Sequence, residues 1–138
     1  LFESFLNFKS SSLLKINSQE TENLTTIDEN GKLIKGKVGS ELTLEEGQEA
    51  AHFCAINIVS QISAACDGDL NKIKNCIKIT GYVNSNDNFI DQPKVINGAS
   101  ELLVKIFGES GKHARAAVSV SSLPLGAAVE VEAIFEIN

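Results

Sequence analysis

Apolar residues recur every three or four positions in two stretches of the chain, which is the spacing of a helix that buries one face. The first stretch follows Thr43, which forms a capping-box pattern with Glu46, so a long helix is predicted from there to a cap near Gly68. The second stretch follows Pro93, a residue suited to a first helical turn, and is predicted to stop at Gly108. Both helices are expected to lie with one face on a sheet.

Apolar and polar residues alternate elsewhere, as they do in strands that bury one face. The strands predicted in this way are residues 13–16, 73–83, 114–123 and 128–137. The last two are joined by a Pro-Leu-Gly turn at residues 124–126, which predicts an antiparallel hairpin. Residues 18–30 are polar and are expected to form a loop.

A short extended piece is also predicted at residues 32–38, between glycines. The order of elements is therefore strands, helix, strand, helix and two strands, which predicts an α+β fold with two helices on one face of a mixed or antiparallel sheet. A length of 138 residues suits one domain, so residues 1–138 are expected to form a single unit. Helices on one face leave the other face against water or another subunit. The residues on that far face are therefore the first candidates for function.

Arg115 and Glu130 are the candidates that the alternation assigns to the far face, together with the small residues Ala117 and Ser119. Arginine is the side chain best shaped to bind a carboxylate through two parallel hydrogen bonds. The predicted hairpin pairs Ser119 with Glu130 and puts Arg115 roughly 13 Å away, so either a ligand lies between the two or they act from different subunits. The alternative interpretation is a solvated arginine and an ordinary surface carboxylate.

Charge and cysteine content narrow the classes of partner. The net charge of −6, with scattered basic residues, argues against a nucleic-acid partner. Three cysteines without CxxC spacing are typical of a reduced, cytoplasmic protein and predict no metal site. No apolar run approaches the roughly 20 residues of a membrane span, so no membrane partner is expected.

Three C-terminal stretches together resemble the signature of one family. They are residues 111–118 (GKHARAAV), 123–126 (LPLG) and 129–133 (VEVEA). They are similar to the RidA family (YjgF, reactive intermediate deaminase), also labelled L-PSP endoribonuclease. Residues 31–39, both predicted helices and the segment 95–98 fit the same family in order and spacing, so the resemblance covers most of the chain after Leu13.

The resemblance implies a chorismate-mutase-like (bacillus-type) fold and a homotrimer with three ligand clefts between subunits. It implies hydrolysis of enamines and imines such as 2-aminoacrylate to 2-keto acids and ammonia, without metal or organic cofactor. Arg115 matches the arginine that binds the substrate carboxylate, and Glu130 matches the glutamate associated with the attacking water. Asn97 matches the asparagine near the cleft, and backbone groups around Ser18 and the position of Ala117 complete the substrate-binding set.

The chain departs from the common family pattern at several positions. Ser-Gly-Gln at the end of the early strand is Asn17-Ser18-Gln19 here, the cysteine two residues after the arginine is Ala117, and Tyr82 is the only tyrosine. His113 before the arginine is typical of a divergent branch of the family.

Three functional hypotheses remain open: an imine/enamine deaminase, a non-catalytic trimeric protein that binds a keto acid, and the endoribonuclease of the family label. Two histidines offer less specific signals. His113 could assist proton transfer near neutral pH, although a strand-entry histidine near solvent is the preferred interpretation. His52 lies within the first helix and is interpreted as structural.

Overall fold

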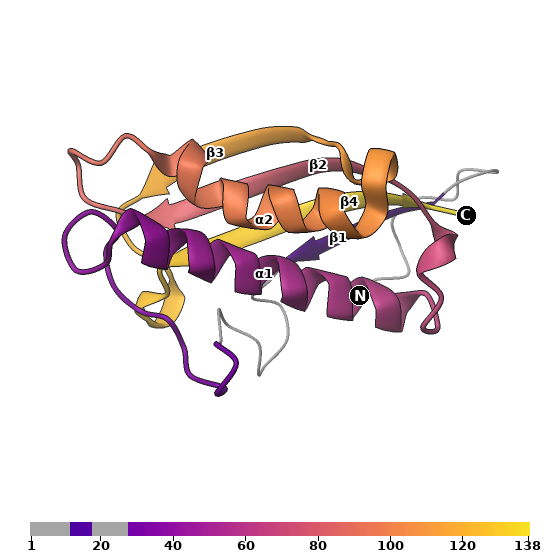
Figure 1. Ribbon diagram of the computed structural model, residues 1–138, viewed down its shortest axis with the longest axis horizontal. Helices are drawn as coiled ribbons and strands as arrows, with labels where there is room; N and C mark the ends of the chain where they lie inside the picture. Colours follow the sequence, from indigo (N-terminus) through magenta and orange to yellow (C-terminus); the bar gives the residue numbers. More distant parts are fainter. Residues whose placement is uncertain (1–11, 18–27) are drawn as a thin grey trace.

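The computed structural model describes residues 12–17 and 28–138, which form two long helices and a four-stranded sheet (Figure 1). The long elements are β1 (Ser12–Asn17), α1 (Leu44–Ala65), β2 (Ile73–Asn84), α2 (Gln92–Phe107), β3 (Ala114–Val120) and β4 (Val129–Ile137). Three short 3-10 helices join them: η1 (Leu70–Lys72), η2 (Gly108–Gly111) and η3 (Pro124–Gly126). Both helices lie over one face of the sheet, which confirms the predicted α+β class (Figure 1).

The strand order is β1-β4-β2-β3, with β4 antiparallel to both neighbours and β3 parallel to β2. The predicted hairpin of the last two strands is therefore wrong, because β2 lies between β3 and β4. Helix α2 forms the crossover between parallel strands and so places β3 on the free edge of β2. The chain then passes the end of β2, where the Asn84 backbone N–H donates to the Ala128 carbonyl, and returns as β4.

Helix α1 begins at the predicted capping box. The Thr43 hydroxyl accepts from the Glu46 backbone N–H at 3.1 Å, and the Glu46 carboxylate accepts from the Thr43 backbone N–H at 2.8 Å. These two bonds satisfy donors that the first helical turn cannot pair internally, which fixes where the helix starts.

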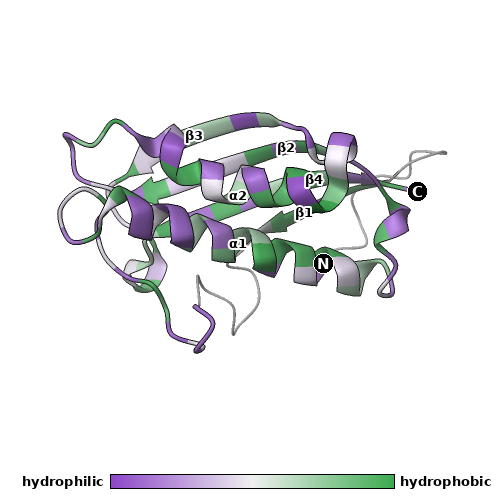
Figure 2. Ribbon diagram, viewed as in Figure 1, coloured by the Kyte–Doolittle hydropathy of each residue, from purple (hydrophilic) through white to green (hydrophobic). Residues whose placement is uncertain are grey.

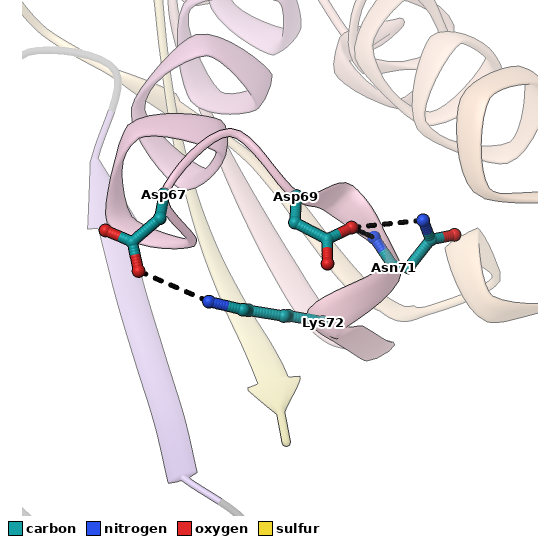
Figure 3. A network of polar contacts seen from close by, with 4 residues as sticks. All are labelled: Asp67, Asp69, Asn71 and Lys72. Carbon is teal, nitrogen blue, oxygen red and sulfur yellow. Dashed lines mark hydrogen bonds and ion pairs between the residues drawn. The ribbon is translucent and has the colours of Figure 1, made fainter.

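The turn after α1 is held by its own polar side chains (Figure 3). Lys72 forms an ion pair with Asp67 at 3.2 Å, and the Asp69 carboxylate accepts from both the backbone and the side chain of Asn71. The chain reverses here through Asp67 and Gly68, which have positive φ, and then enters β2.

The hydrophobic core lies between the helices and the sheet. Figure 2 shows largely hydrophobic strands beneath the helices, and hydrophilic residues on the visible outer surface of α2 and the first half of α1. The largest fully buried side chains include Ile58 and Ile62 of α1, Ile79 and Val83 of β2, Ile96 and Leu103 of α2, and Val131 and Phe135 of β4.

Helices α1 and α2 touch backbone to backbone at Gly98. A Cβ added there would lie 2.1 Å from the Gln48 carbonyl oxygen, a distance that no side chain can adopt. Only glycine therefore permits this close approach. Since Asn97 and Ser100 flank Gly98 on α2, the same contact fixes their height above the sheet.

The opposite face of the sheet has no helix over it within the described part of the chain (Figure 1). It carries half-buried polar groups, among which Glu132 pairs with Lys15 at 3.1 Å and accepts from the Tyr82 hydroxyl at 3.3 Å. It also carries the apolar side chain of Val118, which is 43% exposed. This face is suited to contact with another protein surface.

Candidate functional site

Arg115 lies on the helix side of the sheet, which corrects its predicted orientation. It pairs in register with Ile79 of β2, a fully buried core residue, and Ala117 pairs in the same way with Gly81. Paired residues on neighbouring strands point to the same face, so Arg115 and Ala117 face α2. The alternation was misleading because β3 is an edge strand in which most residues of both faces keep contact with solvent.

The guanidinium of Arg115 is held by two residues of α2. Its Nη1 donates to the Asn97 side-chain oxygen at 2.7 Å and to the Ser100 hydroxyl at 3.2 Å. Asn97 and Ser100 are three residues apart, so they lie on the same face of the helix, directed at β3. The structure thus brings the expected pair Arg115 and Asn97 together.

Both hydrogens of Nη1 are used by these two bonds, which leaves the edge of the guanidinium formed by Nε and Nη2. Within the described residues, no protein group accepts a hydrogen bond from this edge. The side-on edge of arginine presents two parallel donors and matches both oxygens of a carboxylate. Arg115 is therefore oriented by α2 with a carboxylate-binding edge available.

His113 completes the cluster, two residues before Arg115 at the entry to β3. Its Nε2 lies 3.0 Å from the Ser100 Oγ, and its Nδ1 lies 2.6 Å from the carbonyl oxygen of Gly111. His113, Ser100 and Arg115 line a hollow of about 270 Å³, together with Val104 and Lys112. A hollow of this size suits a small metabolite.

Ser100 is the member of this cluster that the sequence analysis missed. Two signals pointed to it: its spacing of three from Asn97 on one helix face, and the spacing of two between His113 and Arg115 on one strand face. Neither signal is specific until α2 is known to pack against β3.

Glu130 lies on the far face of the sheet, because it pairs in register with Tyr82 and its neighbour Val129 is in the core. Burial raises the pKa of the Tyr82 hydroxyl, and the nearby carboxylates of Glu132 and Glu130 raise it further. Arg115 and Glu130 do not share a face within one chain, so the predicted arrangement of the pair on one face is wrong.

The other predicted residues fall in different places. Ser18 and the rest of residues 18–27 lie outside the described residues. Ala117 is half-buried on the Arg115 face of β3 and contacts the core. His52 is exposed on α1, far along the chain from β3, with its ring edge-on to Phe53.

A larger groove of about 510 Å³ runs between the helices, away from β3. Its charged lining is mainly acidic, with Glu45, Glu49 and Glu101 beside Lys105. Such a lining repels carboxylates, so a small acid is better accommodated at Arg115.

The cysteines are buried thiols without a disulfide in the described structure. Burial raises the pKa of Cys76 to about 12, and it also raises the pKa of Cys66. Within residues 12–17 and 28–138, no cluster of three or more His, Cys, Asp or Glu side chains could hold a metal ion. The helices found in those ranges are too short or too polar to cross a membrane.

Comparison with known proteins identifies the family. Residues 7–137 match the family model described as "YjgF/chorismate mutase-like, putative endoribonuclease". Protein TCP17 of Trypanosoma cruzi is 50% identical over 109 residues, which cover 78% of this chain and 68% of that protein.

Two solved structures are similar in both sequence and fold. The protein Atu1372 of Agrobacterium tumefaciens, described as of unknown function, is 49% identical, covers 80% of this chain and 71% of its own, and has a TM-score of 0.77. A protein of Shewanella oneidensis described as a "putative endoribonuclease" is 30% identical, covers 97% and 87%, and has a TM-score of 0.79. The family match over residues 7–137 and the similarity in fold to these two structures agree: the chain belongs to the YjgF/chorismate-mutase-like family.

Proposed function

We propose that this protein hydrolyses enamines and imines of the 2-aminoacrylate type to 2-keto acids and ammonia, at a cleft between copies of the chain. The observation that carries the proposal is the orientation of Arg115. Its Nη1 is fixed by Asn97 and Ser100, its Nε and Nη2 edge meets no acceptor within the described residues, and Arg115 lines a hollow of about 270 Å³. The substrates of such a deaminase share a carboxylate that this edge fits.

The reaction requires a proton at carbon and a water molecule. The enamine gains a proton at C3 and becomes an iminium; water then adds to C2 while a base accepts one of its protons. The carbinolamine that results loses ammonia and leaves the keto acid. Glu130 is proposed as the base that orients the water, in keeping with the resemblance described above.

Glu130 belongs to the far face of its own chain, so the proposal requires that Arg115 and Glu130 of one site come from different copies. The uncovered sheet face supports such an assembly, because it presents Val118 and the half-buried network of Tyr82 and Glu132. A homotrimer is the assembly that the resemblance implies, and it gives three equivalent sites.

Binding of a keto acid without catalysis is the second candidate. It is favoured by one observation, that residue 117 is an alanine and offers no reactive group beside Arg115. Endoribonuclease activity, which the family description names, is less compatible with a net charge of −6, because RNA binding draws mainly on positive charge.

The test is the release of ammonia from 2-aminoacrylate generated by a serine dehydratase, measured with and without the protein. We expect the native protein to accelerate it and Arg115→Ala to lose most of that acceleration. Lys94→Ala is the matched control, because it also removes an exposed positive charge of α2, one that pairs with Asp91 at the N-cap of that helix. A native protein that binds pyruvate in calorimetry but does not accelerate ammonia release would replace the deaminase by the binding function.

A further inference from the structure

Two polar side chains converge on the Ser100 hydroxyl. Arg115 Nη1 of β3 lies 3.2 Å from the Ser100 Oγ, and Nε2 of His113, which directly precedes β3, lies 3.0 Å from it. Ser100 is half-buried on α2, and all three residues line the same hollow. This convergence determines where the hydroxyl hydrogen can point.

The tautomer of His113 follows from its second contact. The carbonyl oxygen of Gly111, 2.6 Å from Nδ1, can only accept a hydrogen bond, so Nδ1 carries a hydrogen. Neutral His113 therefore presents an unprotonated Nε2 to Ser100. The Ser100 Oγ accepts from Arg115, and its own hydrogen is donated to Nε2.

Protonation of His113 reverses this last bond. Nε2 then donates to the Ser100 Oγ, and Arg115 Nη1 donates to the same oxygen. With a donor on each side, the hydroxyl hydrogen cannot point to either neighbour. It is then free to turn into the hollow that Ser100 and Arg115 both line, where Arg115 would hold a carboxylate.

Resting on the deaminase function proposed above, we infer that Ser100 and His113 form the proton relay that delivers a proton to C3 of the bound enamine. Ser100 gives its hydroxyl proton to C3, and the Nε2 proton of His113 moves to the Ser100 Oγ. The C2=C3 double bond supplies the electron pair for the new C–H bond, and the amino nitrogen forms the C=N bond of the iminium. Ser100 is restored, and His113 is left neutral until a hydronium ion from solvent protonates it again.

A structural role for the same residues makes a different prediction. If Ser100 and His113 only held Arg115 in place, their loss would weaken carboxylate binding and leave the chemistry of bound substrate unchanged. A relay from a fixed hydroxyl adds the proton to one face of the enamine, whereas bulk water adds it to both. The stereochemistry of protonation therefore separates the two roles.

The experiment uses 2-aminocrotonate, released from threonine by a dehydratase in D2O, with the native protein. The 2-ketobutyrate formed is reduced at once by lactate dehydrogenase and NADH, and the configuration at the deuterated C3 is determined. The dehydratase alone provides the reference mixture. We expect the native protein to shift the product to one configuration.

Ser100→Ala and His113→Gln should return the reference mixture and slow ammonia release by roughly 100-fold, while calorimetry shows that both still bind 2-ketobutyrate. Ser60→Ala and His52→Gln, which alter exposed residues of α1, are the matched controls and should behave as native.

Three results would overturn the relay, and they are distinguishable. Native acceleration of ammonia release with the reference mixture, or a single configuration that persists in Ser100→Ala, would reject the relay and leave the deaminase intact. No acceleration by the native protein would reject the deaminase, and the relay with it.

Discussion

Arg115 and Glu130 lie on opposite faces of the sheet, and the β2 residues with which they pair are three positions apart. Ile79 pairs with Arg115 on the helix side, and Tyr82 pairs with Glu130 on the far side. Their backbones are therefore separated by roughly 10 Å across the sheet, which is two strand spacings, and by roughly 10 Å along the strands, which is three residues. A three-carbon acid cannot reach both within one chain, so a site that uses both must draw on two chains.

Mixed assembly of two inactive variants tests this relationship. Arg115→Ala and Glu130→Gln should each be inactive alone, and a 1:1 mixture, unfolded and reassembled together, should regain about a quarter of native activity. Half of the chains keep Arg115 and the other half keep Glu130. Random assembly therefore gives about one interface in four that combines both native groups. If no activity returned, although mass spectrometry confirmed mixed oligomers, both groups of one site would have to come from one chain.

Glu130→Gln should separate binding from turnover. Because the proposed role of Glu130 is to orient water rather than to hold the carboxylate, the variant should bind 2-ketobutyrate as the native protein does. Its turnover should fall by roughly 100-fold. The matched variant Glu132→Gln changes the next carboxylate of the same face, which contacts Lys15 and Tyr82, and should retain turnover. Equal loss in both would indicate a structural role for the face.

The far face of the sheet should be buried in a homotrimer. Sedimentation should give three times the chain mass of 14.8 kDa. Val118→Glu should weaken assembly, because it places a charge on an apolar residue of that face, whereas Ile90→Glu should not. Ile90 is 82% exposed and lies in the loop before α2. A native protein that sediments as a monomer would remove the shared site as well.

Cys76 should make stability depend on pH in alkaline solution. Burial raises the pKa of its thiol from 9.0 to about 12, so between those values the unfolded state loses a proton that the folded state retains. The stability contributed is therefore complete below pH 9 and is lost as pH rises toward 12, at up to about 1.4 kcal/mol per unit. Urea unfolding of native protein and Cys76→Ala at several pH values measures it. Identical pH slopes for the two proteins would contradict the assignment.

The helices and β4 could be predicted because each has one strongly buried face and clear ends. The capping box at Thr43 and the alternation ending in Phe135 were sufficient for this. The face of β3 could not be read, since an edge strand with alanines on both faces carries little hydrophobic contrast. The position of β3 beside β2 depends on a crossover through α2, and the turn at Pro124 predicts a hairpin only when that crossover is ignored.

The backbone contact of Gly98 with Gln48 has a thermodynamic consequence for ligand binding. Asn97 and Ser100 flank a position that cannot shift without separating the two helices, so the groups that orient Arg115 are in place before a ligand arrives. A three-carbon imino acid has about six heavy atoms, each able to contribute at most about 1.5 kcal/mol to affinity. With so few atoms, the ligand supplies little binding free energy for ordering a loose site. The rigid helix pair removes most of that ordering cost, so a molecule this small can still be bound.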